Sequence, residues 1–337
     1  MSIWKYSDDF IPQIENDFQL SVGEGNTPLE SFPALATRFN LDNIYLKRED
    51  NNPTGSHKDR GLAYHLSYYI KKGYRDFVIS SSGNSAISAI RFARKYHLNL
   101  DVYLSCKISD SKINRINNIT KEDLIHKTNL KPGTEIEFKN IKIHIDKRPK
   151  VTAFRFSKEN NKPFLRGSTE EHATEGYKSI AFEIYEENPN IDSIFVPTSS
   201  GTTAQGIYDG YKMIEKKVSE NSTWKFPQIH VVQSTKVNPI ARSFDNDFVF
   251  EESSLAKSIV DRVAHRKEKL VDSIIQTNGN GWVVDNESIE QGQKILEDLG
   301  IKCSEEGGLV IAGLIKSLKN KERIMNPVLL ITGTESS

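Results

Sequence analysis

Lys58 has a local sequence that is unusual for a surface lysine. It follows the run Asn-Asn-Pro-Thr-Gly of residues 51–55, which ends a strand-like segment, and Ser56 can cap a new helix through its hydroxyl. Lys58 then lies in the first helical turn, where exposed N–H groups and the positive end of the helix dipole disfavour an ammonium. An amine that acts as a nucleophile or forms an imine must lose its proton, and such surroundings help. A solvated Lys-Asp-Arg cluster at a helix start is the alternative interpretation.

Small polar residues follow three other strand-like segments. In open α/β sheets, ligands gather at the carboxyl ends of strands, so these residues are candidate ligand contacts. Hydroxyls and backbone N–H groups at a helix start suit a phosphate at 199–203 and a carboxylate at 82–85. Each group is also compatible with a plain helix cap or, at 332–334, with a strand that simply ends. The three groups are Ser-Ser-Gly-Asn-Ser at 81–85, Ser-Ser-Gly-Thr-Thr at 199–203 and Thr-Gly-Thr at 332–334.

The sequence around the lysine resembles the lysine motif of the pyridoxal-phosphate enzymes of fold type II. That group includes threonine synthase, threonine dehydratase, cysteine synthase and the β chain of tryptophan synthase. The matching pattern is Gly-Ser-x-Lys-Asp-Arg-Gly, which here spans residues 55–61. The resemblance implies that Lys58 carries pyridoxal 5'-phosphate as a Schiff base and is the catalytic lysine.

The same resemblance gives a role to each of the three polar groups. It implies that Asn84 contacts the hydroxyl oxygen of the cofactor's pyridine ring and that Thr332 bonds the pyridine nitrogen. A hydroxyl partner leaves that nitrogen largely unprotonated and moderates the cofactor as an electron sink. The substrate carboxylate is implied to bind Ser82, Gly83 and Ser85. The cofactor phosphate is implied to bind Ser199, Ser200, Gly201, Thr202 and Thr203.

Other segments indicate which branch of the group is most similar. Gly-Glu-Gly-Asn-Thr-Pro-Leu at 23–29 is a motif found throughout the group, and the segments 175–184 and 231–234 are similar to threonine synthases. Four features depart from the threonine synthase pattern. His57 stands where an aromatic residue is usual before the lysine, and the phosphate loop lacks the usual Gly-Asn. Ser-Glu-Glu-Gly-Gly at 304–308 replaces Glu-Pro-Ala/Ser-Ser, and the end at 334–337 lacks His-Gly. These departures leave cofactor binding as the expectation but weaken the case for O-phosphohomoserine as substrate.

Composition excludes several classes of partner. The chain has 337 residues, with 45 Lys and Arg against 45 Asp and Glu, so neither nucleic acid nor an anionic membrane is expected to bind. No segment approaches the ~20 apolar residues of a membrane span, and the N-terminus lacks the apolar stretch of a signal peptide. Cys106 and Cys303 match no metal-ligand spacing. We therefore expect a cytoplasmic protein with a small-molecule amino-acid substrate and no metal, and the resemblance implies a homodimer.

Alternating strand-like and helix-like segments predict an α/β fold with mainly parallel sheets. The resemblance implies the two-domain, three-layer α/β/α arrangement of fold type II. We expect a large cofactor-binding domain of residues 1–50 and 146–337, and a smaller inserted α/β domain of residues 51–145 that closes over the substrate. Residues 109–162 are polar and weakly periodic, which predicts a mobile insertion or lid. Strands are predicted at 44–48, 77–80, 100–104, 193–196, 228–232 and 328–331.

The function implied by the resemblance is that of a pyridoxal-phosphate-dependent lyase or synthase in amino-acid biosynthesis. The first expectation is a threonine synthase-like β,γ-replacement on O-phosphohomoserine or a related amino acid. Elimination of the threonine or serine dehydratase type and β-replacement of the cysteine or cysteate synthase type remain open. A catalytically diverged homologue that binds the cofactor and acts in regulation is the alternative from another class.

Overall fold

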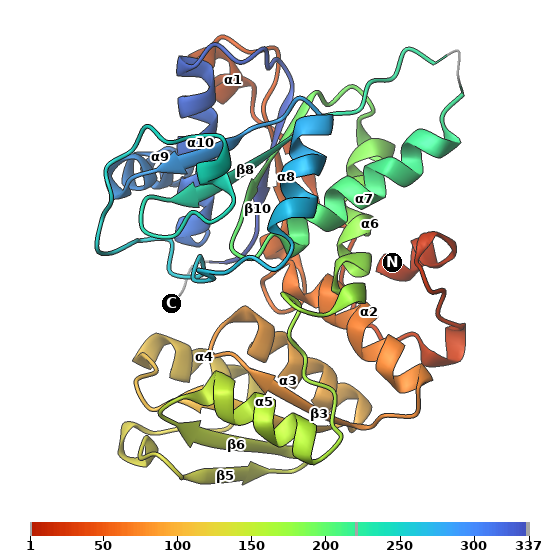
Figure 1. Ribbon diagram of the computed structural model, residues 1–337, viewed down its shortest axis with the longest axis vertical. Helices are drawn as coiled ribbons and strands as arrows, with labels where there is room; N and C mark the ends of the chain where they lie inside the picture. The colour runs from red at the N-terminus through yellow and green to blue at the C-terminus, as the bar shows by residue number, and fades with distance from the viewer. Residues whose placement is uncertain (1, 220–221, 335–337) are drawn as a thin grey trace. The chain divides into compact units, whose positions relative to one another are not determined.

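The structure, a computed structural model, describes residues 2–219 and 222–334 of the chain. Alternating strands and helices form an α/β fold with two mainly parallel sheets, as the sequence predicts (Figure 1). The described residues group into two compact units. The small-sheet unit holds residues 2–25 and 52–176, and the large-sheet unit holds residues 26–51 and 177–334.

The large-sheet unit is built on six strands in the order β1-β2-β10-β7-β8-β9. Strand β1 runs antiparallel to β2, and every other neighbouring pair is parallel. Strand β10 is the last in the chain, yet it lies between β2 and β7 in the interior of the sheet. The strands are β1 (Leu29–Ser31), β2 (Tyr45–Arg48), β7 (Ser193–Pro197), β8 (Gln228–Ser234), β9 (Gly281–Val284) and β10 (Pro327–Ile331).

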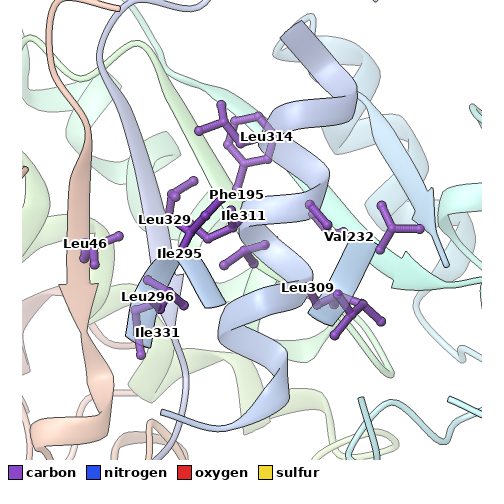
Figure 2. Packing of buried hydrophobic residues seen from close by; sticks show 14 of the residues in the cluster. Leu46, Phe195, Val232, Ile295, Leu296, Leu309, Ile311, Leu314, Leu329 and Ile331 are labelled. Carbon is purple, nitrogen blue, oxygen red and sulfur yellow. The ribbon is translucent and has the colours of Figure 1, made fainter. Parts of the chain in front are cut away.

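Helices cover both faces of this sheet, with α9 and α10 on one side and α7 and α8 on the other (Figure 1). Apolar side chains of α10 fill the core against the strands, where Leu309, Ile311 and Leu314 belong to one buried cluster with Phe195 and Leu329 (Figure 2). The helices wholly or mainly in this unit are α1 (Pro33–Phe39), α6 (Glu175–Glu187), α7 (Thr202–Lys217), α8 (Lys267–Gln276), α9 (Asn286–Asp298) and α10 (Glu305–Lys319).

Glycines let helices α9 and α10 approach each other closely. A Cβ atom on Gly308 would lie 2.4 Å from the carbonyl oxygen of Ile289, and one on Gly292 would lie 2.2 Å from the carbonyl oxygen of Gly308. No side chain fits at such distances from backbone atoms. Gly308, which belongs to a departure from the threonine synthase pattern, therefore has a packing role in this chain.

The small-sheet unit has four strands in the order β3-β4-β6-β5, with β5 antiparallel to β6. Helices α3 and α5 pack on β3, β4 and β6, and α2 packs on α3. The elements are β3 (Asp76–Ser80), β4 (Asn99–Ser105), β5 (Glu135–Phe138), β6 (Ile141–Asp146), α2 (Lys58–Lys71), α3 (Asn84–Tyr96), α4 (Asp110–Thr120) and α5 (Pro149–Glu159). Short 3-10 helices in the two units span Ile3–Asp9, Asn16–Phe18, Glu49–Asn51, Lys127–Asn129, Glu171–Thr174 and Ala241–Ser243.

Residues 109–162, predicted as a mobile insertion or lid, have regular secondary structure, and their mobility stays a prediction. This segment supplies α4, β5, β6 and α5, and β6 lies inside the four-stranded sheet. Ile141, Ile143 and Ile145 are buried and alternate with more polar side chains, which is the period of a strand. The many Lys and Asn residues around this short alternation hid it in the sequence.

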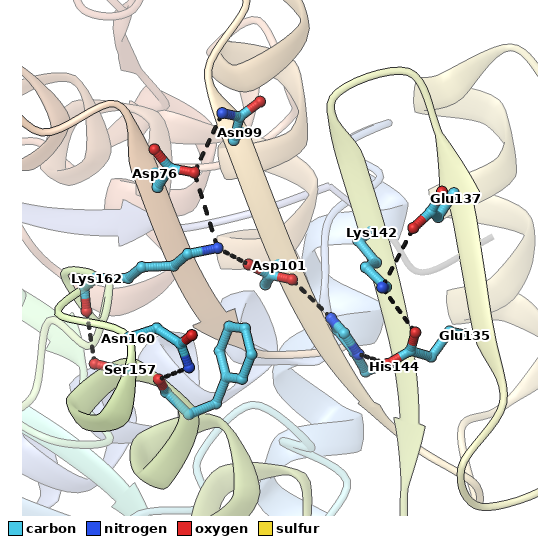
Figure 3. Close-up of polar contacts among 11 residues, drawn as sticks. Asp76, Asn99, Asp101, Glu135, Glu137, Lys142, His144, Ser157, Asn160 and Lys162 are labelled. Atoms are coloured by element: carbon cyan, nitrogen blue, oxygen red, sulfur yellow. Dashed lines mark hydrogen bonds and ion pairs between the residues drawn. The ribbon is translucent and has the colours of Figure 1, made fainter.

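A polar network joins three strands of the small sheet around His144 (Figure 3). The Nε2 atom of His144 lies 2.8 Å from Oδ1 of Asp101 on β4, and its Nδ1 lies 3.0 Å from Oε1 of Glu135 on β5. Its ring stacks on Tyr103, with 4.3 Å between ring centroids. Burial acts to raise the pKa of Asp101, but hydrogen bonds from His144 and from Lys162, at 2.8 Å, outweigh it and lower this pKa. His144 therefore has a structural role between strands.

Three further properties concern cysteines, metals and membranes. Cys106 and Cys303 form no disulfide, and burial raises the pKa of the Cys303 thiol to about 12, which makes it unreactive. Within residues 2–219 and 222–334, no three His, Cys, Asp or Glu side chains are grouped so that they could hold a metal ion. Over the same residues, no helix is long and apolar enough to cross a membrane.

The bounds of the two units differ from those of the predicted domains. Residues 2–25 group with the small-sheet unit, where Trp4 and Phe10 pack on Tyr64 of α2 with ring centroids 6.2 and 5.4 Å away. Residues 146–176 group with it too, because α5 packs on the small sheet. Cofactor binding by one domain and closure of the other over the substrate stay predictions.

Candidate active site

Lys58 is the first residue of helix α2, and hydrogen bonds fix the turn before it. The Oγ atom of Ser56 accepts the N–H of Lys58 at 3.2 Å, but the N-cap residue is His57 and not, as the sequence predicts, Ser56. The carboxylate of Asp59 accepts hydrogen bonds from the N–H and the hydroxyl of Thr54 at 2.8 and 2.6 Å. Gly55 has a φ of +76°, in the left-handed region that favours glycine. The backbone of Lys58 is therefore held by a well-defined turn.

The buried acid Glu24 lies in the Gly-Glu-Gly segment, which is hydrogen-bonded to the turn before Lys58. Gly25 donates its N–H to Oδ1 of Asn52 at 2.9 Å, which ties the Gly-Glu-Gly motif to the lysine turn. Glu24 is fully buried, and its Oε2 accepts the N–H of Val22 at 2.8 Å and the hydroxyl of Ser21 at 3.0 Å. Its Oε1 has no hydrogen-bond partner in the part of the chain that the structure describes. Burial raises the pKa of Glu24 to about 7, so this acid titrates near neutral pH.

The loop 81–85 leads into helix α3 and is open around its glycine. Residues 81–85 are all partly exposed, and α3 begins at Asn84 after the N-cap residue Gly83, whose N–H donates to Oγ of Ser81 at 3.2 Å. Gly83 has a φ of −117°, which any residue can adopt, and a Cβ atom there would have no heavy atom within 4 Å. Neither conformation nor packing thus requires a glycine. The space at Gly83 lies beside the start of α3, where the first N–H groups of a helix can bind an anion.

Asn84 is held by an arginine from helix α4. The Nη2 atom of Arg115 donates a hydrogen bond to Oδ1 of Asn84 at 2.7 Å. Arg115 is partly buried, and burial lowers its pKa. Among the described residues, Asn84 is its hydrogen-bond partner and no carboxylate forms an ion pair with it. A cation without a counter-ion therefore adjoins the residue that is predicted to contact the cofactor ring.

The loop 199–203 is packed tightly around a left-handed glycine. It follows β7, and α7 begins at Thr202 with Gly201 as the N-cap residue. Gly201 has a φ of +88°, and a Cβ atom there would lie 2.7 Å from Cδ2 of Leu270, so both conformation and space favour glycine. The hydroxyls of Ser200 and Thr202 lie 2.9 Å apart. The first N–H groups of α7, together with these hydroxyls, form a donor set that suits a phosphate.

The side chain of Ser199 is hydrogen-bonded to the neighbouring segment that contains Val260 and Asp261. Its Oγ atom accepts the N–H groups of Val260 and Asp261, both at 3.1 Å, and donates to Oδ2 of Asp261 at 3.0 Å. Because the single hydroxyl proton of Ser199 goes to this carboxylate, the side chain does not offer a donor to an anion. Of the five residues predicted to bind phosphate, Ser199 is therefore placed as a support for the loop.

Two residues outside the predicted set also contact this loop. The buried Gln233 donates from Nε2 to the carbonyl oxygen of Thr198 at 3.0 Å, and its Oε1 accepts the backbone N–H groups of residues 240–241 at 2.9 and 2.8 Å. Arg266 donates from Nη1 to the hydroxyl of Thr202 at 3.4 Å. Gln233 fixes the shape of the loop, and Arg266 brings a positive charge to it.

Thr332 follows β10, the strand that pairs in parallel with β7. The carboxyl ends of neighbouring parallel strands lie at the same edge of a sheet, so Thr332 and the loop 199–203 share one edge of the large sheet. Thr332 is buried, and the carbonyl oxygen of Gly333 after it accepts the N–H of Ser304 at 3.0 Å. The departure from the threonine synthase pattern at 335–337 lies outside the described residues.

The predicted site residues divide between the two units. Lys58 and the loop 82–85 belong to the small-sheet unit, whereas the loop 199–203 and Thr332 belong to the large-sheet unit. Arg115 and Arg266 are contacts that sequence reasoning missed. Each is one basic residue among many on a polar segment, and no motif marks it, so tertiary structure alone identifies its partner.

Sequence relatives of the chain are amino-acid enzymes. The threonine synthase of Methanosarcina acetivorans is 26% identical over 324 residues, which cover 94% of this chain and 74% of that protein. The biosynthetic L-threonine dehydratase of Pasteurella multocida is 23% identical and covers 87% of this chain, but the match spans only 53% of that protein.

Solved structures with the same fold extend this likeness. Maize serine racemase has a TM-score of 0.75 at 15% identity, covering 98% of this chain and 92% of its own. The processed threonine deaminase isoform 2 of Solanum lycopersicum has a TM-score of 0.75 at 17% identity, covering 98% and 84%. At these identities the likeness establishes the fold alone.

A family model described as "Pyridoxal-phosphate dependent enzyme" matches residues 20–333. The match contains the Gly-Glu-Gly motif, the lysine turn, the polar loops at 81–85 and 199–203, and the first two residues of the group at 332–334. The fold agrees with it, since both sheets are mainly parallel and the similar solved structures share this architecture. The chain therefore belongs to the pyridoxal-phosphate-dependent enzymes of fold type II, a family whose members bind pyridoxal 5'-phosphate.

Proposed function

We propose that this enzyme is an amino-acid lyase or synthase with a threonine synthase-like β,γ-replacement as its reaction, on O-phosphohomoserine or a related amino acid. The observation that carries the proposal is the lysine turn, in which Ser56 and Asp59 fix Lys58 at the start of α2. The threonine synthase of Methanosarcina acetivorans, which matches 94% of the chain, supports the choice within the family.

The residues present fit the cofactor. For the phosphate, we assign the N-terminus of α7 with Gly201, Thr203 and the hydroxyls of Ser200 and Thr202, and Ser199 supports the loop. Arg266 adds a positive charge that partly offsets the nearby Asp261. For the ring, we assign Thr332 to the nitrogen and Asn84 to the hydroxyl oxygen. For the substrate carboxylate, we assign Ser82, Gly83 and Ser85, because the unfilled space at Gly83 leaves room for a ligand.

When bound, pyridoxal phosphate supplies an electron sink that stabilises negative charge on a substrate carbon. Lys58 would hold the cofactor through Nζ, and the same amine, once free, would accept and return protons at the substrate carbons. The N–H groups at the start of α3 orient the substrate through its carboxylate. Thr332, which contributes a neutral hydroxyl, adds no charge at the ring nitrogen, so the electron demand stays moderate.

A second reaction type is favoured by a specific relative. The L-threonine dehydratase of Pasteurella multocida matches 87% of the chain, which supports elimination from a hydroxy amino acid as an alternative. The same residue set also suits β-replacement of the cysteine or cysteate synthase type. A regulatory homologue that binds the cofactor but has lost the reaction is the alternative from another class.

The first experiment measures cofactor binding through colour. Purified protein is expected to be yellow, with a visible absorption band that is lost in Lys58→Ala and kept in Lys71→Ala, the matched lysine in the last turn of α2. A colourless wild-type protein that takes up no added pyridoxal phosphate would overturn the proposal.

The second experiment identifies the reaction. The yellow protein is incubated with O-phosphohomoserine, threonine, serine, O-acetylserine or phosphoserine, and phosphate, ammonia and amino-acid products are measured. Threonine and phosphate from O-phosphohomoserine would establish replacement, ammonia from threonine or serine would establish elimination, and no turnover would favour the regulatory alternative. Sedimentation of the same sample tests the expected homodimer.

A further inference from the structure

The bond between Arg115 and Asn84 fixes which way round the Asn84 amide lies. A guanidinium carries only donors, so the atom that faces it at 2.7 Å must be the amide oxygen Oδ1. The orientation of an asparagine amide is usually assigned from its surroundings, and here chemistry permits only one assignment. The Nδ2 group, with its two N–H donors, therefore points away from Arg115.

The charge of Arg115 is not neutralised by an acid in the described structure. Burial lowers its pKa, and in the described residues no carboxylate pairs with it. Arg48, another partly buried arginine, instead pairs with Asp50 at 2.7 Å and Glu30 at 2.8 Å. A partly buried cation without a counter-ion is costly unless a ligand supplies negative charge. The position next to Asn84 is thus electrically suited to an anionic atom.

We propose that Arg115 is a positioning residue that holds the Asn84 amide with its Nδ2 donors directed at the ring oxygen of pyridoxal phosphate. This proposal rests on the proposed function, because the role of Asn84 toward the ring comes from the family resemblance. The ring oxygen is an acceptor and carries negative charge when ionised, so it needs a donor rather than Oδ1. Arg115 supplies the correct orientation through its hydrogen bond and adds a positive charge that favours the ionised oxygen.

The test compares cofactor-loaded wild type with Arg115→Gln and Arg115→Lys by pH titration of the visible band. Because a nearby cation disfavours protonation, Arg115→Gln is expected to move the midpoint upward by about one pH unit. The dissociation constant for pyridoxal phosphate is expected to rise about tenfold. Arg115→Lys keeps the charge and one donor, so both changes should be smaller.

Two further variants separate positioning from a loss of packing. Arg94→Gln removes another arginine between α3 and α4, whose Nη1 donates to the carbonyl oxygen of Ile119 at 2.6 Å, and it should leave the band midpoint unchanged. If Arg115 acts through Asn84, then Arg115→Gln in an Asn84→Ala background should change the dissociation constant by less than twofold.

The outcomes are separable. An unchanged midpoint and dissociation constant in Arg115→Gln would overturn the role of Arg115 while leaving the proposed function intact. Shifts of the band midpoint in Arg94→Gln as large as those in Arg115→Gln would also overturn the role of Arg115. So would a change of the dissociation constant by Arg115→Gln that is as large in the Asn84→Ala background as in the wild type. A wild-type protein that binds no cofactor would overturn the proposed function and this inference together.

Discussion

Two loops of this enzyme have the same plan, a strand followed by small polar residues and the start of a helix, but they are built differently. In the loop after β7, Gly201 has a φ of +88°, and a Cβ atom there would lie 2.7 Å from Cδ2 of Leu270. In the loop after β3, Gly83 has an ordinary backbone conformation and open space at its Cβ position. Backbone conformation and packing explain why residue 201 is a glycine, but they do not explain why residue 83 is one.

This difference bears on the two anions assigned to these loops in the proposed function. Under that proposal the loop after β7 would hold a phosphate that stays bound through every turnover, and Gly201, Gln233 and Leu270 fix the shape of this loop in advance. The loop after β3 would bind the carboxylate of a substrate that enters and leaves, and a Cβ atom on its Gly83 would have nothing within 4 Å. Packing therefore fixes the first loop and leaves space at the second.

The largest expected effect is a pH dependence of the free energy of unfolding, caused by Glu24. The pKa of Glu24 is raised from 4.5 to about 7 by burial, so between these values the folded state binds more protons than the unfolded state. Stability should therefore fall as pH rises through this window, by about 3 kcal/mol. The loop after β7 offers neutral hydroxyls. We therefore attribute this pH dependence of stability to Glu24, in the segment that is hydrogen-bonded to the lysine turn.

Glu24→Gln is expected to remove that decline. Urea unfolding of wild type and variant at pH 5 and pH 8 measures it, since the difference between the two proteins isolates the contribution of this side chain. If wild type and Glu24→Gln showed the same pH dependence of the free energy of unfolding, then ionisation of Glu24 would cost the folded state little and this prediction would be wrong.

Gly201→Ala should have the next largest effect. A left-handed conformation costs a residue with a Cβ atom about 1–2 kcal/mol, and the contact with Leu270 adds to this, so we expect a loss of about 2 kcal/mol. The control is Gly133→Ala, which has a φ of +89° but nothing within 4 Å of the new Cβ atom. If both variants lose the same free energy of unfolding in urea, then packing around Gly201 is not tight.

Arg266→Gln should weaken the phosphate site without affecting the fold. A hydrogen bond from a charged group contributes about 1.5–3 kcal/mol, so the dissociation constant for pyridoxal phosphate should rise about tenfold or more. Pyridoxal, which lacks the phosphate, should bind equally well to variant and wild type. The exposed Arg262 provides the matched control, Arg262→Gln. Equal losses for both ligands would place Arg266 away from the phosphate.

Gly83→Ala should have the smallest effect on stability and is the direct test of the open loop. We expect the free energy of unfolding to change by less than about 0.5 kcal/mol, because neither backbone strain nor a close contact results. Substrate affinity, followed through the change of the visible band on titration, should fall several-fold. A large loss of stability would mean that the fold itself requires this glycine, and the contrast with Gly201 would fail.

Much of the fold could be predicted because its strands are short apolar runs between polar loops. The predicted strands at 44–48, 77–80 and 193–196 are confirmed as β2, β3 and β7 within one or two residues. Strand β6 was not predicted, because only three alternating isoleucines indicate it in the sequence. The sequence predicts the N-terminal segment in the large domain, whereas residues 2–25 group with the small-sheet unit, and nothing in the sequence shows that Trp4 packs on Tyr64.

The candidate site was predictable where a motif carries the chemistry. Lys58, Asn84 and Thr332 each stand at a fixed place after a strand, and the structure puts them at helix starts or a strand end. Arg115 and Arg266 could not be found, because a side chain that reaches a loop from another helix leaves no local pattern. Sequence also could not separate Ser199, whose hydroxyl is engaged by Asp261, from its neighbours.

The place of β10 in the large sheet has a consequence for biosynthesis. A growing chain makes β2 early, yet its parallel partner β10 is made after every other described strand. Until then β2 and β7 have no strand between them, whereas every strand of the small sheet has already been synthesised. One edge of β2 and one edge of β7 therefore stay unpaired until β10 is made, and chaperones have their longest opportunity to bind the nascent protein there.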